Sequence, residues 1–337
     1  MSCLHLARQA LLSALGLLAM TLPTAPASAA TDKVRIALQF GMPFVPFYVA
    51  ESEGLFKKHL AAAGAGGVAV ELPRISGSAA LNDAMISGSV DMAVYGITGL
   101  MIAWDRTRGG ASAVIGLAGV TSAPAKLVTL RPDLKSVRDL NPSDRVAIPA
   151  LISYTGFVLR MVAEKEFGKT NALDSYLVAM AHPDAMNALI GKSEITVHVA
   201  LAPFYDWELK QPGAHVILNT NDVLGKATTF ALGVRQGYAE ANPPVMKAII
   251  AALDEANALI KQDARRAAEI YLKNEPLKQM DAAFIAEVIG APDNIYATDI
   301  WGTTKFTDFL VRTGAMKTKP ASWKDLYLPY IHDRPGD

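Results

Sequence analysis

Three short turns combine hydroxyl and glycine residues with the predicted start of a helix. They are Ser76-Gly77-Ser78, Gly96-Ile97-Thr98 and Ser153-Tyr154-Thr155-Gly156. A helix N-terminus has unpaired backbone N–H groups and a partial positive charge of about half an elementary charge. It can therefore hold a carboxylate, a sulfonate or a phosphate. Ordinary N-capping by Ser and Thr is the simpler explanation of any single turn. Three such turns, each after a predicted strand, leave capping and anion binding open.

An aromatic turn is the second candidate for ligand contact. It follows a predicted strand at 34–38 and carries Phe40, Phe44 and Phe47 together with two prolines. Proline locks φ near −65° and favours the first position of a helix, so these rings lie on a stiff connection. They are either core residues that close one end of a sheet, or one wall of a ligand cleft at the carboxyl ends of the strands.

Catalytic motifs give no support for an enzyme. The sequence lacks the common phosphate-binding, zinc-protease and nucleophile-elbow patterns, and its histidines do not have metal-ligand spacing. The histidines after residue 30 are His59, His182, His198, His215 and His332. His198 lies late in a predicted strand and is the best ligand candidate, although a hydrogen-bonded structural histidine is the more ordinary interpretation. Asp91, just before another predicted strand, is interpreted as a cap or turn carboxylate and not as a catalytic acid.

The elements that must position these residues alternate along the chain. Strands are expected at 34–38, 68–72, 92–95, 114–118, 126–130, 146–148, 177–179, 195–201, 216–218 and 229–234. Helices are expected at 46–54, 79–86, 98–106, 136–140, 153–167, 183–190, 203–208, 243–261, 264–273, 281–289 and 303–313. Residues 55–60 either continue the first of these helices or add a turn to it. Such alternation predicts an α/β fold with mostly parallel sheets flanked by helices.

A repeated layout suggests two similar lobes. Residues 82–94 and 186–199 both read as a helix, a small-residue turn and a strand, although common α/β patterns could produce the same likeness. We expect one lobe from 30–123 plus 226–337 and a second from 124–225. Because ligands of open α/β sheets bind outside the carboxyl ends of the strands, a cleft is expected between the lobes.

The composition narrows the class of protein. The chain has 337 residues, of which 51% are hydrophobic, and this is long enough for two domains. Its 32 basic and 32 acidic side chains give a formal charge of zero. The sequence therefore has no electrostatic footprint for nucleic acid.

The N-terminal segment has the layout of a secretory signal. A weakly basic start with Arg8 precedes an apolar run at 10–22 and the triplet Ala27-Ser28-Ala29. We expect a signal peptide over 1–29 with cleavage after Ala29. The run is shorter than the roughly 20 apolar residues of a spanning helix. Cys3 is the only cysteine, so the exported chain would have no disulfide, thiolate metal site or cysteine nucleophile.

Several segments together resemble the substrate-binding proteins of ABC importers, of the nitrate, sulfonate and taurine (NitT/TauT) class. The matching segments are 46–56, 76–81 with Ser76-Gly77-Ser78, 86–93, 134–149, 202–204 and 243–268. They extend over nearly all of the chain after residue 30, and they are specific as a set and not singly. The resemblance implies the two-lobed type II periplasmic binding protein fold, with the ligand cleft between the lobes.

The resemblance also implies a function. The protein would be a periplasmic monomer that delivers a small-molecule ligand to an inner-membrane permease with its cytoplasmic ATPase, without catalysis, cofactor or metal. The ligand-binding residues carried over are Phe40, Gly41, Phe44, Ser76, Gly77, Ser78, Tyr95, Gly96, Thr98, Ser153, Tyr154, Thr155, His198 and Phe204.

The sequence departs from the family pattern in the second lobe. Thr196 stands where the family often has an acidic residue, which argues against taurine or nitrate as the ligand. The nearest cations by sequence are Arg74 and Lys126. A site rich in rings and poor in charge favours a small organic anion with an apolar or aromatic body.

Two other functions stay open at this stage. One is an enzyme on the same fold, similar to a pyrimidine-precursor synthase, against which the signal and the absence of cysteine after residue 30 argue. The other is a periplasmic sensor partner, which the sequence does not separate from an importer component.

Overall fold

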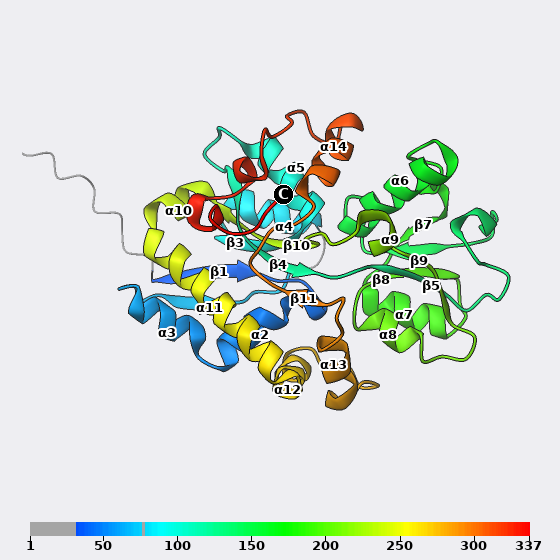
Figure 1. Ribbon diagram of the computed structural model, residues 1–337, viewed down its shortest axis with the longest axis horizontal. Helices are drawn as coiled ribbons and strands as arrows, with labels where there is room; N and C mark the ends of the chain where they lie inside the picture. Colours follow the sequence, from blue (N-terminus) through cyan, green and yellow to red (C-terminus); the bar gives the residue numbers. More distant parts are fainter. Residues whose placement is uncertain (1–31, 76–77) are drawn as a thin grey trace, which may run out of the picture. The chain divides into compact units, whose positions relative to one another are not determined.

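The computed structural model describes residues 32–75 and 78–337, and for residues 78 and 79 only the backbone. Within these residues, two sheets are flanked by helices (Figure 1). The first has the order β11-β4-β10-β3-β1-β2 and the second the order β7-β6-β8-β5-β9. The strands are β1 (Lys33–Ala37), β2 (Ala69–Glu71), β3 (Met92–Gly96), β4 (Val114–Ser122), β5 (Lys126–Thr129), β6 (Val146–Ile148), β7 (Leu177–Ala179), β8 (Val197–Ala200), β9 (His215–Asn219), β10 (Phe230–Arg235) and β11 (Ile295–Tyr296).

Both sheets are mixed, which corrects the expectation of mostly parallel strands. Parallel pairs are β1 with β2 and β3, and β6 with β7 and β8. Strands β10 and β5 are antiparallel to both of their neighbours. The reason is the path of the chain: β4 leads out of the first sheet and β10 returns to it from the second. Because β10 lies beside β4, the two must run in opposite directions.

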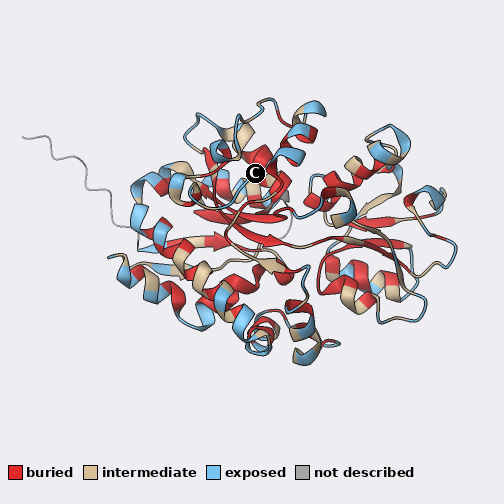
Figure 2. Ribbon diagram, in the orientation of Figure 1, coloured by how far each residue is buried: buried red, intermediate tan, exposed pale blue. Residues whose placement is uncertain are grey.

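The helices cover both faces of each sheet. They are α2 (Val45–Ser52), α3 (Leu55–Ala62), α4 (Ser78–Ser87), α5 (Ile97–Thr107), α6 (Tyr154–Phe167), α7 (His182–Ile190), α8 (Phe204–Glu208), α9 (Asn221–Leu224), α10 (Gln236–Ala241), α11 (Pro243–Gln262), α12 (Ala264–Asn274), α13 (Ala282–Ile289) and α14 (Thr303–Arg312). Helices α2, α3 and α11 lie on one side of the first sheet and α4 and α5 on the other (Figure 1). The central strands are buried, and the exposed residues concentrate on the outer faces of the helices (Figure 2).

The predicted elements match the observed ones closely, with a few differences. Strand β4 extends four residues beyond its expected end at 118, because it continues toward the second sheet. The 3₁₀ turn Met42–Phe44 precedes α2, and the helix expected at 136–140 is a 3₁₀ turn at Val137–Asp139. The short elements α9, α10 and β11 were not predicted, since each is too brief to carry a hydrophobic period.

The predicted signal segment lies outside the described residues. None of the helices between residues 32 and 337 has both the length and the apolar character to cross a membrane. The strands of the first sheet come from 33–122 and 230–296, and those of the second from 126–219. The division into lobes at 30–123 plus 226–337 and 124–225 stays a prediction.

Asp91 is a structural carboxylate. It is 3% exposed, and its two oxygens accept hydrogen bonds from the backbone N–H and guanidinium of Arg35 and from Nη2 of Arg235. Burial alone would raise the pKa of Asp91, but the hydrogen bonds from these arginines outweigh it and hold the pKa below its usual value. The pairing joins β1, β3 and the end of β10.

Replacing Asp91 with asparagine is expected to lower the free energy of unfolding by about 1.5–3 kcal/mol at pH 7, because charge-assisted hydrogen bonds are lost. Since the folded pKa is depressed, this contribution is present above the unfolded value near 3.9 and disappears as the pH falls through the folded pKa. Urea unfolding at pH 7 and pH 3 measures both effects. Asp133→Asn is the control, because Asp133 forms an ion pair with Arg131 and its side chain is 61% exposed. A deficit for Asp91→Asn that persists undiminished at pH 3 would contradict the assignment.

Candidate functional site

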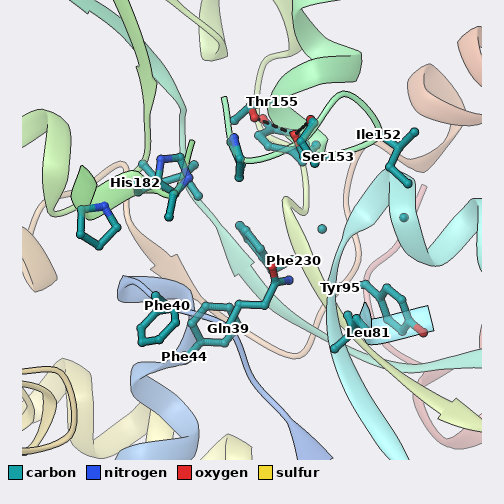
Figure 3. Close-up of a pocket in the computed structure, with 18 residues that line it drawn as sticks. Gln39, Phe40, Phe44, Leu81, Tyr95, Ile152, Ser153, Thr155, His182 and Phe230 are labelled. Atoms are coloured by element: carbon teal, nitrogen blue, oxygen red, sulfur yellow. Dashed lines mark hydrogen bonds between the residues drawn. The ribbon is translucent and has the colours of Figure 1, made fainter. Parts of the chain in front are cut away.

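A pocket of about 300 Å³ lies between the two sheets and takes residues from both (Figure 3). It is lined by Gln39, Phe40, Phe44, Leu81, Tyr95, Gly96, Gly99, Pro149, Ala150, Ile152, Ser153, Tyr154, Thr155, Ala181, His182, Pro183, Leu201 and Phe230. Most of these follow the carboxyl ends of β1, β3, β6, β7 and β8. This is where ligands bind in open α/β sheets.

Three helices begin at the pocket. Gly96, Ser153 and Ala181 are the N-cap residues of α5, α6 and α7, and all three line the cavity. Each helix adds unpaired N–H groups and a partial positive charge at its start. The Ser153 hydroxyl oxygen caps α6 by accepting from the N–H of Gly156 at 3.2 Å. The same turn therefore caps α6 and places the partial positive charge of the helix start at the pocket.

The walls of the pocket are largely apolar and aromatic. The rings of Phe44 and Phe230 meet edge to face with centroids 5.8 Å apart. Phe40 is 43% exposed, and the guanidinium of Arg74 lies 5.0 Å from its ring centroid. Among the described residues that line the cavity, none is Arg, Lys, Asp or Glu. An anion here would meet helix N-termini and hydroxyls, and not a formal positive charge.

Half of the predicted ligand-binding residues line this pocket. They are Phe40, Phe44, Tyr95, Gly96, Ser153, Tyr154 and Thr155. The Ser153 and Thr155 hydroxyl oxygens lie 2.9 Å apart on the pocket rim (Figure 3). The structure thus brings the first-sheet aromatic turn and the second-sheet hydroxyl turn to one cavity. That these residues contact a ligand stays a prediction.

Gly41 and Thr98 are placed beside the pocket and do not line it. Gly41 has φ of +118°, which favours glycine, and its N–H donates to Oε2 of Glu275 at 2.9 Å. Thr98 is 1% exposed in the first turn of α5. Of the turn at 76–78, Ser76 and Gly77 lie outside the described residues, and for Ser78 only the backbone is described, at the start of α4.

The placement of His198 and Phe204 corrects their expected direct contact with a pocket ligand. Both are completely buried and neither lines the cavity. Successive residues of a strand point to opposite faces of the sheet, and the His198 side chain points to the face covered by α7 and α8 instead of to the strand end. Phe204 stacks on the His182 ring with centroids 5.6 Å apart.

His182 is a pocket residue that the sequence prediction missed. It is the first residue of α7, directly after the N-cap that follows β7. The other predicted site turns occupy the same strand-to-helix position, and this shared position was the signal that could have identified it. Gln39, Leu81, Leu201 and Phe230 were missed as well, since nothing in their local sequence distinguishes a pocket wall from core.

A buried hydrogen-bonded chain stands behind His182. Its Nδ1 lies 2.9 Å from Nε2 of His198, whose Nδ1 lies 2.5 Å from Oε1 of Glu208. Burial lowers the pKa of His198 to about 3 and also lowers that of His182, with the neighbouring His198 as a second cause. Burial raises the pKa of Glu208 to about 9. All three shifts favour neutral side chains at pH 7.

Comparison with known proteins places the chain by sequence and by fold. The model of the NMT1-like family matches residues 27–272. A search of curated proteins finds no match. The fold is similar to that of the alkanesulfonate-binding protein SsuA from Xanthomonas axonopodis pv. citri bound to MOPS, at 16% identity and a TM-score of 0.68, over 86% of this chain and 95% of that one.

Two further solved structures have the same fold. One is the periplasmic aliphatic sulphonate-binding protein SsuA from Escherichia coli, at 19% identity and a TM-score of 0.66, over 88% of this chain and 92% of that one. The other is the periplasmic nitrate-binding protein NrtA from Synechocystis PCC 6803, at 16% identity and a TM-score of 0.64, over 91% of this chain and 86% of that one. The resemblance predicted from the sequence is therefore confirmed for the fold, which is that of periplasmic binding proteins.

Proposed function

This chain belongs to the NMT1-like family, and from that premise we propose that it is the extracytoplasmic solute-binding component of an ABC importer. It captures a small organic anion with an apolar or aromatic body in the pocket between its two sheets. The protein works as a periplasmic monomer, exported by the signal at 1–29, and delivers the anion to a permease of the inner membrane that is driven by a cytoplasmic ATPase.

One observation carries the choice of ligand: the N-caps of α5, α6 and α7 meet at a cavity with aromatic walls. The helix N-termini suit one anionic group, and the rings of Phe40, Phe44 and Phe230 suit a flat or apolar body. A volume of about 300 Å³ is at the small end of ligand pockets, so the ligand is small. Three of the proteins with a similar fold are named as sulfonate-binding or nitrate-binding, which agrees with an anion.

Capture is proposed to involve movement of the two lobes, 30–123 plus 226–337 against 124–225. The chain crosses between the sheets after β4 and before β10, and these crossovers would serve as hinges. The predicted contacts with ligand are those made by Phe40, Phe44, Tyr95, Gly96 and the 153–155 turn. His182 joins them, since it lines the same cavity.

A thermal-shift series tests the proposal. Benzenesulfonate, benzoate, methanesulfonate and nitrate are compared, and a compound at 100 times its Kd is expected to add about 2.7 kcal/mol of stability. The matched variant is Gly99→Leu. Gly99 lines the pocket from α5, and the nearest heavy atom to an added Cβ is Cδ1 of Tyr95 at 3.6 Å, so the Cβ has room and leucine is expected to extend into the cavity.

We expect Gly99→Leu to fold with equal or greater stability, since leucine favours a helix more than glycine does, and to lose the shift. If no anion of the series raises the unfolding midpoint of the unaltered protein, the proposed ligand class is wrong. If Gly99→Leu keeps the full shift, the proposed pocket is wrong. Conversion of a bound compound into a product would replace the binding function with an enzymatic one.

A further inference from the structure

The proposed anion site has no lysine or arginine among the described residues that line it. The imidazole of His182 is a candidate hydrogen-bond donor to the anion. Its ring lines the cavity and is 7% exposed. Its Nε2 is buried and has no hydrogen-bond partner among the described residues, whereas its Nδ1 is bonded to His198. Figure 3 shows His182 on the cavity wall, across from Gln39 and Phe44.

We propose that Glu208 and His198 act as positioning residues that fix the tautomer of His182, so that its Nε2–H faces the pocket and donates a hydrogen bond to an anionic oxygen of the ligand. This inference rests on the proposed function. It names the Nε2–H of His182 as the group that makes the pocket prefer a ligand with a hydrogen-bond acceptor.

The tautomer follows from the order of donors along the chain. When one proton is shared between Glu208 and Nδ1 of His198, Nε2 of His198 must carry its own hydrogen and donate it to Nδ1 of His182. A neutral His182 then carries its hydrogen on Nε2. This result is the same whether the shared proton sits on the carboxyl group or on the imidazole. Loss of that proton reverses every bond, and His182 then presents a lone pair to the pocket.

The surroundings of Glu208 favour the protonated chain. Glu208 and His198 have no exposed surface, and Oε2 of Glu208 has no hydrogen-bond partner among the described residues. An ionised carboxylate would be a buried anion with one oxygen unpaired and no arginine or lysine beside it within the described part. A proton on Oε2 would leave a buried O–H unpaired, whereas an unpaired carbonyl oxygen is better tolerated. The proton therefore belongs between Oε1 and Nδ1 of His198.

The other titratable groups on the elements packed around Glu208 and His198 do not reverse the preference for the protonated pair. They are Asp184 on α7, Tyr205 and Asp206 on α8, and Lys126 on β5. Asp206 and Glu208 repel each other when both are charged, which opposes ionisation of Glu208. The Lys126 ammonium lies 4.3 Å from the Tyr205 ring centroid and interacts with Asp206, not with Glu208. Burial, which raises the pKa of Glu208 to about 9, agrees with a protonated chain at pH 7.

The consequence is a pocket whose preference for anions depends on pH. Above the pKa of the chain, the lone pair of His182 faces the ligand oxygen, so an anion is repelled instead of bonded. Benzenesulfonate is a suitable probe, because its own charge does not change between pH 5 and pH 10. Any change in its affinity therefore reports on the protein.

The test is nitrogen NMR of the full exported chain labelled with ¹⁵N-histidine, without ligand. At pH 7 we expect the Nε2–H tautomer for both His182 and His198, with assignments from His182→Asn and His198→Asn. At pH 10 both are expected to switch together to Nδ1–H, and in Glu208→Gln, whose amide N–H replaces the acid proton, neither should switch. An Nδ1–H tautomer for His182 at pH 7, or a switch that survives in Glu208→Gln, would overturn the inference.

The second readout is the Kd of benzenesulfonate, which we expect to rise at least tenfold between pH 7 and pH 10 in the unaltered protein and to change little in Glu208→Gln. An unchanged Kd in the unaltered protein would refute the donor role. The two proposals fail separately: correct tautomers with no binding of benzenesulfonate or of any other anion of the thermal-shift series would refute the proposed ligand class. If Glu208→Gln does not fold, the joint switch of the two histidines in the unaltered protein decides the matter alone.

Discussion

Replacing Glu275 with alanine is expected to lower the free energy of unfolding by about 3–5 kcal/mol, because three buried donors lose their acceptor and each unpaired buried donor costs about 1–3 kcal/mol. Glu275 is 5% exposed at the end of α12. Its Oε2 accepts from the N–H of Gly41 at 2.9 Å and from the Tyr271 hydroxyl at 3.1 Å. Its Oε1 accepts from the Tyr48 hydroxyl at 2.8 Å. Alanine leaves these donors buried without a partner.

The same substitution is expected to weaken ligand binding. Arg74 lies 3.4 Å from Oε1 of Glu275 and also stands over the Phe40 ring, so Glu275 fixes both the loop after β1 and the cation behind its exposed ring. Urea unfolding measures the stability loss, with Glu255→Ala as the matched control. Glu255 pairs with Lys58 and His59, but its side chain is 32% exposed. The loss of stability in Glu255→Ala should therefore be much smaller than in Glu275→Ala. Equal losses for the two variants would contradict the anchoring role.

Replacing Gly96 with valine is expected to raise the Kd for benzenesulfonate by about 5- to 150-fold, which corresponds to the 1–3 kcal/mol typical of overpacking. A Cβ at Gly96 would lie 3.1 Å from Cβ of Tyr154 and 3.5 Å from its backbone nitrogen. Gly96 ends β3 of the first sheet, and Tyr154 begins α6, which follows β6 of the second sheet. This contact therefore sets how closely the two sides of the pocket approach. Neither atom of Tyr154 can swing away, because both are at or next to its backbone.

The fold itself should tolerate this valine. Gly96 has φ of −58° and ψ of 138°, which any residue adopts, so the substitution adds no backbone strain. Calorimetric titration measures the Kd, and urea unfolding checks that the stability is retained. Gly67→Val is the control, because no heavy atom lies within 4 Å of a Cβ at that glycine. An unchanged Kd for Gly96→Val would show that the close contact between Gly96 and Tyr154 does not limit binding.

Much of the fold could be predicted because the signals are local. Apolar runs bounded by glycine and proline located the strands, and the long amphipathic pattern located α11. The direction of β10 could not be predicted from its own residues, because it depends on the neighbour beside which the returning chain lies. The mixed sheets follow from that long-range choice.

The site divides in the same way. The turns at 40–44, 95–96 and 153–155 carry their own signals, and the structure brings them to one cavity. The roles of Gly41 and His198 depend on partners far away along the chain or behind the pocket wall. Glu275 lies 234 positions from Gly41, and His198 meets His182 only through the packing of α7 on β8. No local sequence pattern predicts such pairs of residues.

A crystal structure of the protein grown with benzenesulfonate tests the central claim most directly. We predict the sulfonate group at the meeting point of α5, α6 and α7, with an oxygen within hydrogen-bond distance of Nε2 of His182, and the ring packed against the wall that Phe44 and Phe230 form. An empty pocket at saturating benzenesulfonate, or a sulfonate group that points away from these helix N-termini, would contradict the account.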